Sequence, residues 1–259
     1  FINNNTMPEN PYYIGLMTGT SLDGIDGILT SFKNYHNTIQ LPFPKKLRNE
    51  LISLQYKGFD EIHRSEIASN EIAYLYSDCV SSLLKNENIN QSQVMAIGAH
   101  GQTIRHQPLF GYTKQIVNSA LLAELSGIDV IADFRSRDIA AGGQGAPLVP
   151  AFHNEFFSNQ NQTILILNIG GISNITILRP KSKIIGFDTG PGNILMDEWI
   201  YRNKNQTFDN HGDWARHGTI IPELLNLMLN EPYFLKSPPK STGRDLFNSI
   251  WLEKKIRNF

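Results

Sequence analysis

Apolar positions in the first half of the chain alternate between runs typical of strands and spacings typical of helices. Three runs rich in β-branched and aromatic residues predict an opening group of three strands. Apolar residues at helical spacing then predict a short helix and a long helix that packs across the sheet. Two nearly continuous apolar runs, with a helix between them, are typical of strands buried on both faces. The predicted elements are residues 12–17, 25–32, 37–43, 45–54, 59–87, 94–99, 119–126 and 128–134.

The pattern restarts in the second half, about 150 residues after the first copy begins. Apolar runs at 163–169, 175–178 and 183–187 predict three more strands, with a small polar turn, 170–174, after the first of them. A helix is predicted to begin at Asn193, a residue type that often caps helices. The sequence therefore predicts an α/β fold with a duplicated core.

The segment between the two copies, residues 135–150, mixes charge with glycine and proline, which suits a crossing between lobes. We place the boundary at Arg137. The predicted lobes are residues 1–137 and 138–259. Only helices and loops are predicted over 206–259, so the second lobe is expected to stop after its first helix and to be incomplete in this chain. The later helices are predicted at 147–157, 222–230, 232–239 and from Thr242, where Asp245 would complete a capping box.

Composition narrows the classes of partner. With 23 Lys and Arg against 24 Asp and Glu, the 259-residue chain has a formal charge of -1, so it has no broad basic field for nucleic acid or an anionic membrane. No apolar run reaches the length of about 18 residues that spans a bilayer. Cys79 is the single cysteine, so no internal disulfide can form and a reducing, cytoplasmic location is expected. Because the sequence starts at Phe1 rather than Met, we expect it to be a piece of a longer product.

Two loops of small residues are candidate phosphate sites. The first, Thr18–Gly24, joins the first two strands and consists almost wholly of Gly, Thr, Ser and Asp. Glycine lets a backbone approach a ligand closely, and successive exposed amides suit phosphate oxygens. The second loop, Gly170–Asn174, has the same place in the second copy. Either loop alone is equally typical of an ordinary hairpin connection, but the pair is more specific.

Three aspartates are candidates for chemistry. Asp188 follows the third strand of the second copy, and ligand sites gather at the carboxyl ends of strands in α/β folds. It is a general-base candidate, although it also suits a turn in which its side chain only orders Thr189 and Gly190. Asp23 and Asp26 either orient a hydrated Mg²⁺ beside the first loop or are simply turn and edge-strand residues.

His100 and Arg135 follow the two buried strands of the first lobe, and Gln102 lies just beyond His100. These side chains either meet a ligand or form a satisfied polar network. The chain has no P-loop motif, and no His, Cys, Asp or Glu set has the close spacing of metal ligands, so no directly ligated metal is expected.

Six motifs together resemble the anhydro-N-acetylmuramic acid kinases, which belong to the actin, sugar kinase and Hsp70 superfamily. The motifs are MTGTSLDGIDG, GAHGQT, ADFRSRDIAAGGQGAPLVPAFH, LNIGGISN, GFDTGPGNILMD and PKSTGRDLFN. The resemblance implies duplicated ribonuclease H-like, actin-like ATPase lobes around a cleft. It also implies a homodimer that uses ATP with Mg²⁺, and water, to convert 1,6-anhydro-N-acetylmuramic acid to N-acetylmuramic acid 6-phosphate in peptidoglycan recycling. The alternatives are another sugar or acyl kinase, or an inactive relative that binds muramyl sugars or another subunit.

The resemblance assigns the catalytic base to Asp188 and ATP binding to the first loop. With the second loop included, the expected ATP-binding residues are Gly19, Thr20, Ser21, Leu22, Asp23, Gly24, Ile25, Asp26, Gly170, Gly171 and Ser173. The expected sugar-binding residues are His100, Gln102, Arg135, Thr189, Gly190 and Asn193.

Overall fold

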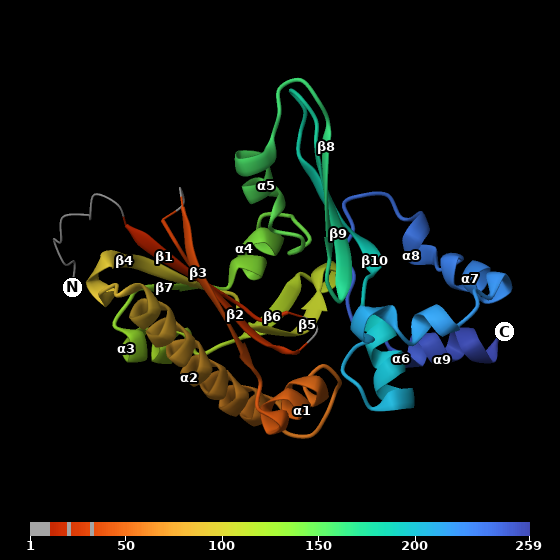
Figure 1. Ribbon diagram of the computed structural model, residues 1–259, viewed down its shortest axis with the longest axis horizontal. Helices are drawn as coiled ribbons and strands as arrows, with labels where there is room; N and C mark the ends of the chain where they lie inside the picture. Colours follow the sequence, from red (N-terminus) through yellow and green to blue (C-terminus); the bar gives the residue numbers. More distant parts are fainter. Residues whose placement is uncertain (1–10, 20–21, 32–33) are drawn as a thin grey trace. The chain divides into compact units, whose positions relative to one another are not determined.

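The computed structural model describes residues 11–19, 22–31 and 34–259. The chain divides into two compact units (Figure 1). The N-terminal unit comprises the described residues up to Gln107 together with 112–136, and the C-terminal unit comprises 108–111 and 137–259. No helix among the described residues is both long and apolar enough to cross a bilayer.

The N-terminal unit contains a five-stranded sheet in the order β3-β2-β1-β4-β7. The first three strands form an antiparallel meander, and β4 and β7 continue the sheet in parallel with β1. This is the strand order of a ribonuclease H-like lobe. The strands are β1 Tyr12–Met17, β2 Gly24–Thr30, β3 Tyr35–Pro42, β4 Val94–Ala99 and β7 Val130–Ala132. The predicted meander and the two parallel strands are confirmed, although residue 32 of the second predicted strand lies outside the described residues. The last strand is shorter than the predicted 128–134 and is not buried on both faces, because Ile131 is 57% exposed.

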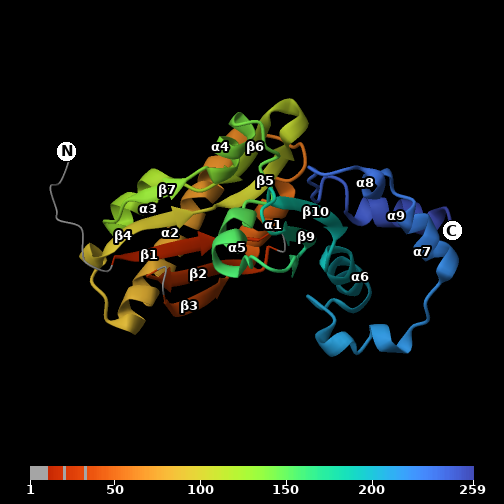
Figure 2. The same cartoon turned by 90° about the horizontal axis from the view of Figure 1, so that it is seen from above.

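The long helix α2 (Glu61–Glu87) crosses one face of this sheet (Figure 2). It buries Tyr76, Cys79 and Leu83 against the strands. The sheet comes close because β2 has a glycine at the crossing, where a Cβ on Gly27 would collide with Cys79 Sγ. The other helices of this unit are α1 Lys45–Ser53, α3 Ser119–Ser126 and the start of α4 Phe134–Ala140, with a 3-10 turn at Gln91–Gln93.

Two strands and one helix were not predicted. Strands β5 (Gln102–Gln107) and β6 (Tyr112–Ile116) form a separate antiparallel hairpin, with a 3-10 turn at Pro108–Phe110 between them. The sequence QTIRHQ lacks the apolar alternation that is typical of a strand, so β5 could not be predicted from the pattern. Helix α4 occupies part of the expected crossing segment.

The sheet of the C-terminal unit has three antiparallel strands in the order β10-β9-β8. They are β8 Ile164–Ile169, β9 Ile172–Leu178 and β10 Ile185–Pro191. Helix α5 (Pro150–Phe157) packs against β9, and a Cβ on Gly186 of β10 would collide with Pro150. The second meander and the α/β class are therefore confirmed.

The rest of the C-terminal unit is helical, and residues 192–259 contain no strand. Its helices are α6 Ile194–Lys204, α7 Pro222–Leu229, α8 Pro232–Leu235 and α9 Ser249–Arg257, with 3-10 turns at Asn210–Gly212 and Ala215–His217. A second small core forms here from Tyr233, Phe247, Trp251 and Leu252. The helix predicted from Thr242 is wrong, because α9 begins at Ser249 and Asn248 caps it by accepting a hydrogen bond from the Trp251 amide.

Candidate functional site

The described part of the first loop is fixed to the core of the N-terminal unit at both ends. Thr18 is buried, and its hydroxyl donates to the Gly101 carbonyl at 2.7 Å. Leu22 is fully buried in a left-handed conformation, with φ of 58°. Thr20 and Ser21, which were expected to bind ATP, lie outside the described residues.

The residues after this turn have different environments. Gly24 is needed for packing, because a Cβ there would collide with the Leu41 carbonyl of β3, and Ile25 is fully buried in the core. Asp23 and Asp26 are exposed. Partial desolvation and the neighbouring Asp23 raise the pKa of Asp26 above its ordinary value. The loop therefore presents two neighbouring carboxylates on its surface.

His100 and Arg135, which follow the two parallel strands β4 and β7, form a hydrogen bond with each other. The Arg135 Nε donates to His100 Nε2 at 2.8 Å, and His100 Nδ1 lies 2.6 Å from the Gly101 carbonyl. Burial and the charge of Arg135 lower the pKa of His100 to about 4, so the imidazole is neutral at pH 7. The same two causes lower the pKa of His106 to about 4.

Gln102 is fully buried and links this region to the first loop. Its Nε2 donates to the Gly19 carbonyl at 3.3 Å, while its Oε1 has no hydrogen-bond partner among the described residues. The N-terminal unit therefore brings the first loop and the GAHGQT motif into direct contact.

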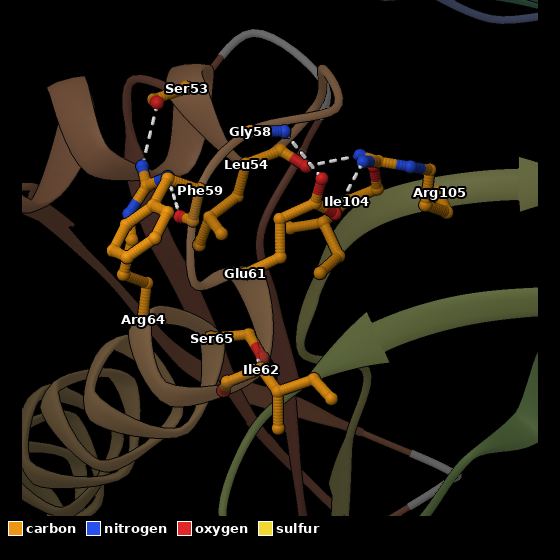
Figure 3. Close-up of polar contacts among 10 residues, drawn as sticks. All are labelled: Ser53, Leu54, Gly58, Phe59, Glu61, Ile62, Arg64, Ser65, Ile104 and Arg105. Carbon is orange, nitrogen blue, oxygen red and sulfur yellow. Dashed lines mark hydrogen bonds and ion pairs between the residues drawn. The ribbon is translucent and has the colours of Figure 1, made fainter.

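A cluster of ion pairs that the sequence did not reveal anchors β5, the strand that Gln102 begins (Figure 3). Arg105 pairs with Glu61 at 2.7 Å and also donates to the Leu54 carbonyl. Arg64 on the next turn of α2 donates to Ser53 at 2.6 Å. These contacts join the end of α1, the start of α2 and β5 into one support.

In the C-terminal unit, Asp188 is held by main-chain and side-chain contacts from a distant segment. Its amide donates to the Lys240 carbonyl at 3.1 Å, and its carbonyl accepts from the Tyr233 hydroxyl at 2.7 Å. The Thr242 amide donates to Asp188 Oδ2 at 3.0 Å. Asp188 is only 5% exposed. Residues 240–242 thus lie along the outer edge of β10.

This arrangement corrects one expectation. Asp188 does not follow its strand, because β10 continues to Pro191. The strand was predicted too short because the sequence DTGPG resembles a turn, but the 240–242 segment satisfies the edge of β10 and keeps it extended. A turn that only orders Thr189 and Gly190 is therefore not what Asp188 forms.

Lys240 and Tyr233 complete the support of Asp188. The Lys240 ammonium lies 3.3 Å from the Tyr233 and Phe234 carbonyls and 4.8 Å from the centre of the Tyr233 ring. Burial and then the charge of Asp188 raise the pKa of Tyr233 above its ordinary value, so the phenol keeps its proton and donates. Sequence reasoning missed both residues, because they act through contacts that are remote along the chain.

The second loop is shorter than predicted. Only Gly170 and Gly171 lie between β8 and β9, so Ser173 belongs to a strand and is buried. The carbonyls of the two glycines accept hydrogen bonds from the amides of Asn193 and Gly192, each at 2.9 Å. The loop therefore supports the start of α6.

The remaining expected sugar contacts also lie near β10. The Thr189 hydroxyl donates to the Ser173 carbonyl at 3.1 Å, and Gly190 packs against the Phe234 ring with φ of 144°. Asn193 precedes α6, but its side chain makes no capping bond, contrary to its expected role, and its Oδ1 is buried without a partner among the described residues. Across the part of the chain that the structure describes, no three His, Cys, Asp or Glu side chains are grouped to hold a metal.

The strand order and the repeated meander define an α/β protein with a duplicated ribonuclease H-like core. The family model for anhydro-N-acetylmuramic acid kinase matches residues 11–259. A relative with that name from Ralstonia nicotianae is 51% identical over 255 residues, covering 93% of this chain and 67% of the relative. One from Cupriavidus metallidurans is 51% identical over 268 residues, covering 98% and 70%. The chain therefore belongs to the anhydro-N-acetylmuramic acid kinase family.

Similarity to solved structures is weaker. The ethanolamine utilization protein EutJ from Carboxydothermus hydrogenoformans aligns with a TM-score of 0.42 and 13% identity, covering 97% of this chain and 83% of that one. A reductive activator for a corrinoid, iron-sulfur protein aligns with a TM-score of 0.40 and 13% identity, covering 72% and 32%. Because both TM-scores are low, the fold assignment rests on the strand order and the family.

Proposed function

We propose that this chain carries the catalytic base of a kinase that uses ATP and water to convert 1,6-anhydro-N-acetylmuramic acid to N-acetylmuramic acid 6-phosphate. The single observation that supports this most is the buried carboxylate of Asp188 in the DTGPGN motif. Its Oδ2 accepts a hydrogen bond from the Thr242 amide, and its backbone is bonded to Lys240 and Tyr233. A base must be held within reach of one defined proton, and this support provides such orientation.

The chemistry follows from the position of one carboxylate. Asp188 removes a proton from water, whose oxygen bonds to the anomeric carbon of the sugar. The bond from that carbon to the bridging 6-oxygen breaks, and the 6-oxygen takes the γ-phosphoryl group as ADP leaves. One base therefore serves both bond changes.

ATP phosphates are assigned to the two loops. In the first loop the residues are Gly19, Thr20, Ser21, Leu22, Asp23, Gly24, Ile25 and Asp26, and in the second they are Gly170, Gly171 and Ser173. The exposed carboxylates of Asp23 and Asp26 suit the water shell of Mg²⁺, which when bound neutralises phosphate charge. The buried Leu22 and Ile25 act by shaping the loop rather than by touching the nucleotide.

The sugar is assigned to six residues. These are His100, Gln102, Arg135, Thr189, Gly190 and Asn193. Gln102 Oε1 and Asn193 Oδ1 are buried without a partner in the part of the chain that the structure describes, which supports this assignment because a sugar offers many hydroxyl donors. A neutral His100 likewise avoids placing a second positive charge beside Arg135.

A cytoplasmic location and a homodimer complete the proposal, and sedimentation of the purified chain measures its oligomeric state.

The test is to incubate a full-length version of the protein with ATP, Mg²⁺ and the anhydro sugar, and to quantify sugar phosphate and ADP by mass spectrometry. The wild type should form both in equal amounts. Asp188→Asn should retain the fold and lower turnover by about 10²-fold or more. A wild type that forms no sugar phosphate, or an Asp188→Asn variant with normal turnover, contradicts the proposal.

A further inference from the structure

Two buried side-chain oxygens next to Asp188 have no hydrogen-bond partner among the described residues. They are Asn174 Oδ1 and Thr242 Oγ1. Buried polar groups in folded proteins are nearly always paired, with protein or with an ordered water. Two unpaired oxygens beside one buried carboxylate therefore indicate a small polar ligand.

Both residues are brought to Asp188 by contacts that the structure defines. Asn174 of β9 pairs directly with Asp188 of β10, and opposed residues of antiparallel strands carry their side chains on the same face of the sheet. Thr242 reaches Asp188 from the outer edge of β10, where its amide donates to Oδ2 at 3.0 Å. Asn174 and Thr242 therefore reach Asp188 from two sides of β10, one from the neighbouring strand and one from its outer edge.

We propose that Asn174 and Thr242 hold the water that Asp188 deprotonates, an inference that rests on the proposed function. A water molecule has two protons and two lone pairs. It donates one proton to Asp188 and the other to Asn174 Oδ1, and it accepts a hydrogen bond from the Thr242 hydroxyl. One lone pair then remains for attack. A carboxylate has about four acceptor positions, so the Thr242 amide and the water can share Asp188.

The step balances. The O–H bond facing Asp188 breaks and its proton moves to the carboxylate, while the oxygen lone pair forms the bond to the anomeric carbon. The electron pair of the broken bridge goes to the 6-oxygen, which takes the γ-phosphoryl group of ATP. Asn174 and Thr242 touch the attacking water, so both are catalytic residues in this assignment.

The decisive measurement is competition between water and methanol. Methanol gives a methyl glycoside phosphate where water gives the free sugar phosphate, and the ratio of the two products reports how well water is held. Thr242→Val removes the hydroxyl and keeps the shape. It should lower kcat by about 10-fold or more, leave KM for ATP unchanged, and raise the methyl product ratio by at least about threefold.

Matched variants separate this role from a structural one. Thr242→Ser keeps the hydroxyl and should restore the wild-type ratio, while Thr219→Val, at an exposed threonine of the same unit, should change nothing. Asn174→Ala should raise the ratio as Thr242→Val does, which keeps the test valid if one variant folds poorly.

An unchanged ratio in both Thr242→Val and Asn174→Ala, with wild-type turnover and an essential Asp188, overturns this inference and leaves the proposed function standing. A wild type without sugar phosphate overturns both.

Discussion

At the scale of single residues, the burial of His100 and the charge of Arg135 beside it contribute to how stability depends on pH. Because burial and Arg135 lower its pKa to about 4, folded His100 stays neutral where an unfolded histidine, with a pKa of about 6.5, already binds a proton. The unfolded state therefore gains a proton first as the pH falls, and His106 adds to the effect with the same sign.

Stability should fall as the pH is lowered from about 6.5 to 4, by about 2 kcal/mol for His100. Urea unfolding followed by circular dichroism at half-unit pH steps measures this. His100→Asn should flatten the fall between pH 6.5 and 5, where carboxylates contribute little, and His63→Asn, at an exposed position, should not. A steep wild-type profile that His100→Asn leaves unchanged would contradict the assigned cause.

At the scale of elements, the support of β5 rests on one guanidinium. Arg105 pairs with Glu61 at side-chain exposures of 20% and 35%, and it also donates to the Leu54 carbonyl. A partly buried arginine that joins a carboxylate and a carbonyl stabilises more than a surface pair does.

Arg105→Ala should therefore lower the free energy of unfolding by about 1–2 kcal/mol and speed amide exchange in Gln102–Gln107. Arg257→Ala removes a surface pair at 79% exposure and should change stability by less than about 0.5 kcal/mol. Equal effects of the two changes on stability and exchange would show that the Arg105 contacts do not hold the strand.

The helices and strands also show which parts of the fold can be predicted from the sequence. The meanders and α2 were predictable because β-branched runs and helical spacing mark buried faces directly. The β5–β6 hairpin was missed because its residues are mostly polar and half-buried. At Thr242 the local capping-box signal favoured a helix, but the Thr242 amide bonds to Asp188 instead and residues 244–246 form only a turn.

The residues of the candidate site were likewise only partly predictable from the sequence. Asp188, His100 and Arg135 were identified because they follow apolar runs, which place them at the ends of strands or near them. Tyr233 and Thr242 were not, because their role depends on contacts with a residue far earlier in the chain, which no local spacing encodes. Local patterns therefore locate Asp188, and only the folded chain reveals its support.

At the scale of the whole molecule, the two units have cores of very different size. The N-terminal unit buries one extensive cluster between α2 and its five-stranded sheet, whereas the helical end of the C-terminal unit is organised around four buried residues. Since burial of apolar surface is the main stabilising term, the C-terminal unit should unfold first.

Tryptophan fluorescence can report the unfolding of the C-terminal unit separately. Its three tryptophans, Trp199, Trp214 and Trp251, all lie in the C-terminal unit. Their fluorescence should change at a urea concentration about 1 M or more below that at which the amides of α2, in the N-terminal unit, lose their protection from exchange. Coincident transitions would mean that the two units unfold cooperatively.

The contact between Asp188 and Thr242 also sets an order of events during synthesis. The two residues are 54 positions apart, so at about 5–20 residues per second the ribosome needs about 3–11 s to make the second after the first. During that interval the carboxylate has no supporting segment, while the described sheet of the N-terminal unit, whose last strand ends at Ala132, is already synthesised. The ribosome therefore completes the sheet that supports the first loop before it makes the segment that surrounds Asp188.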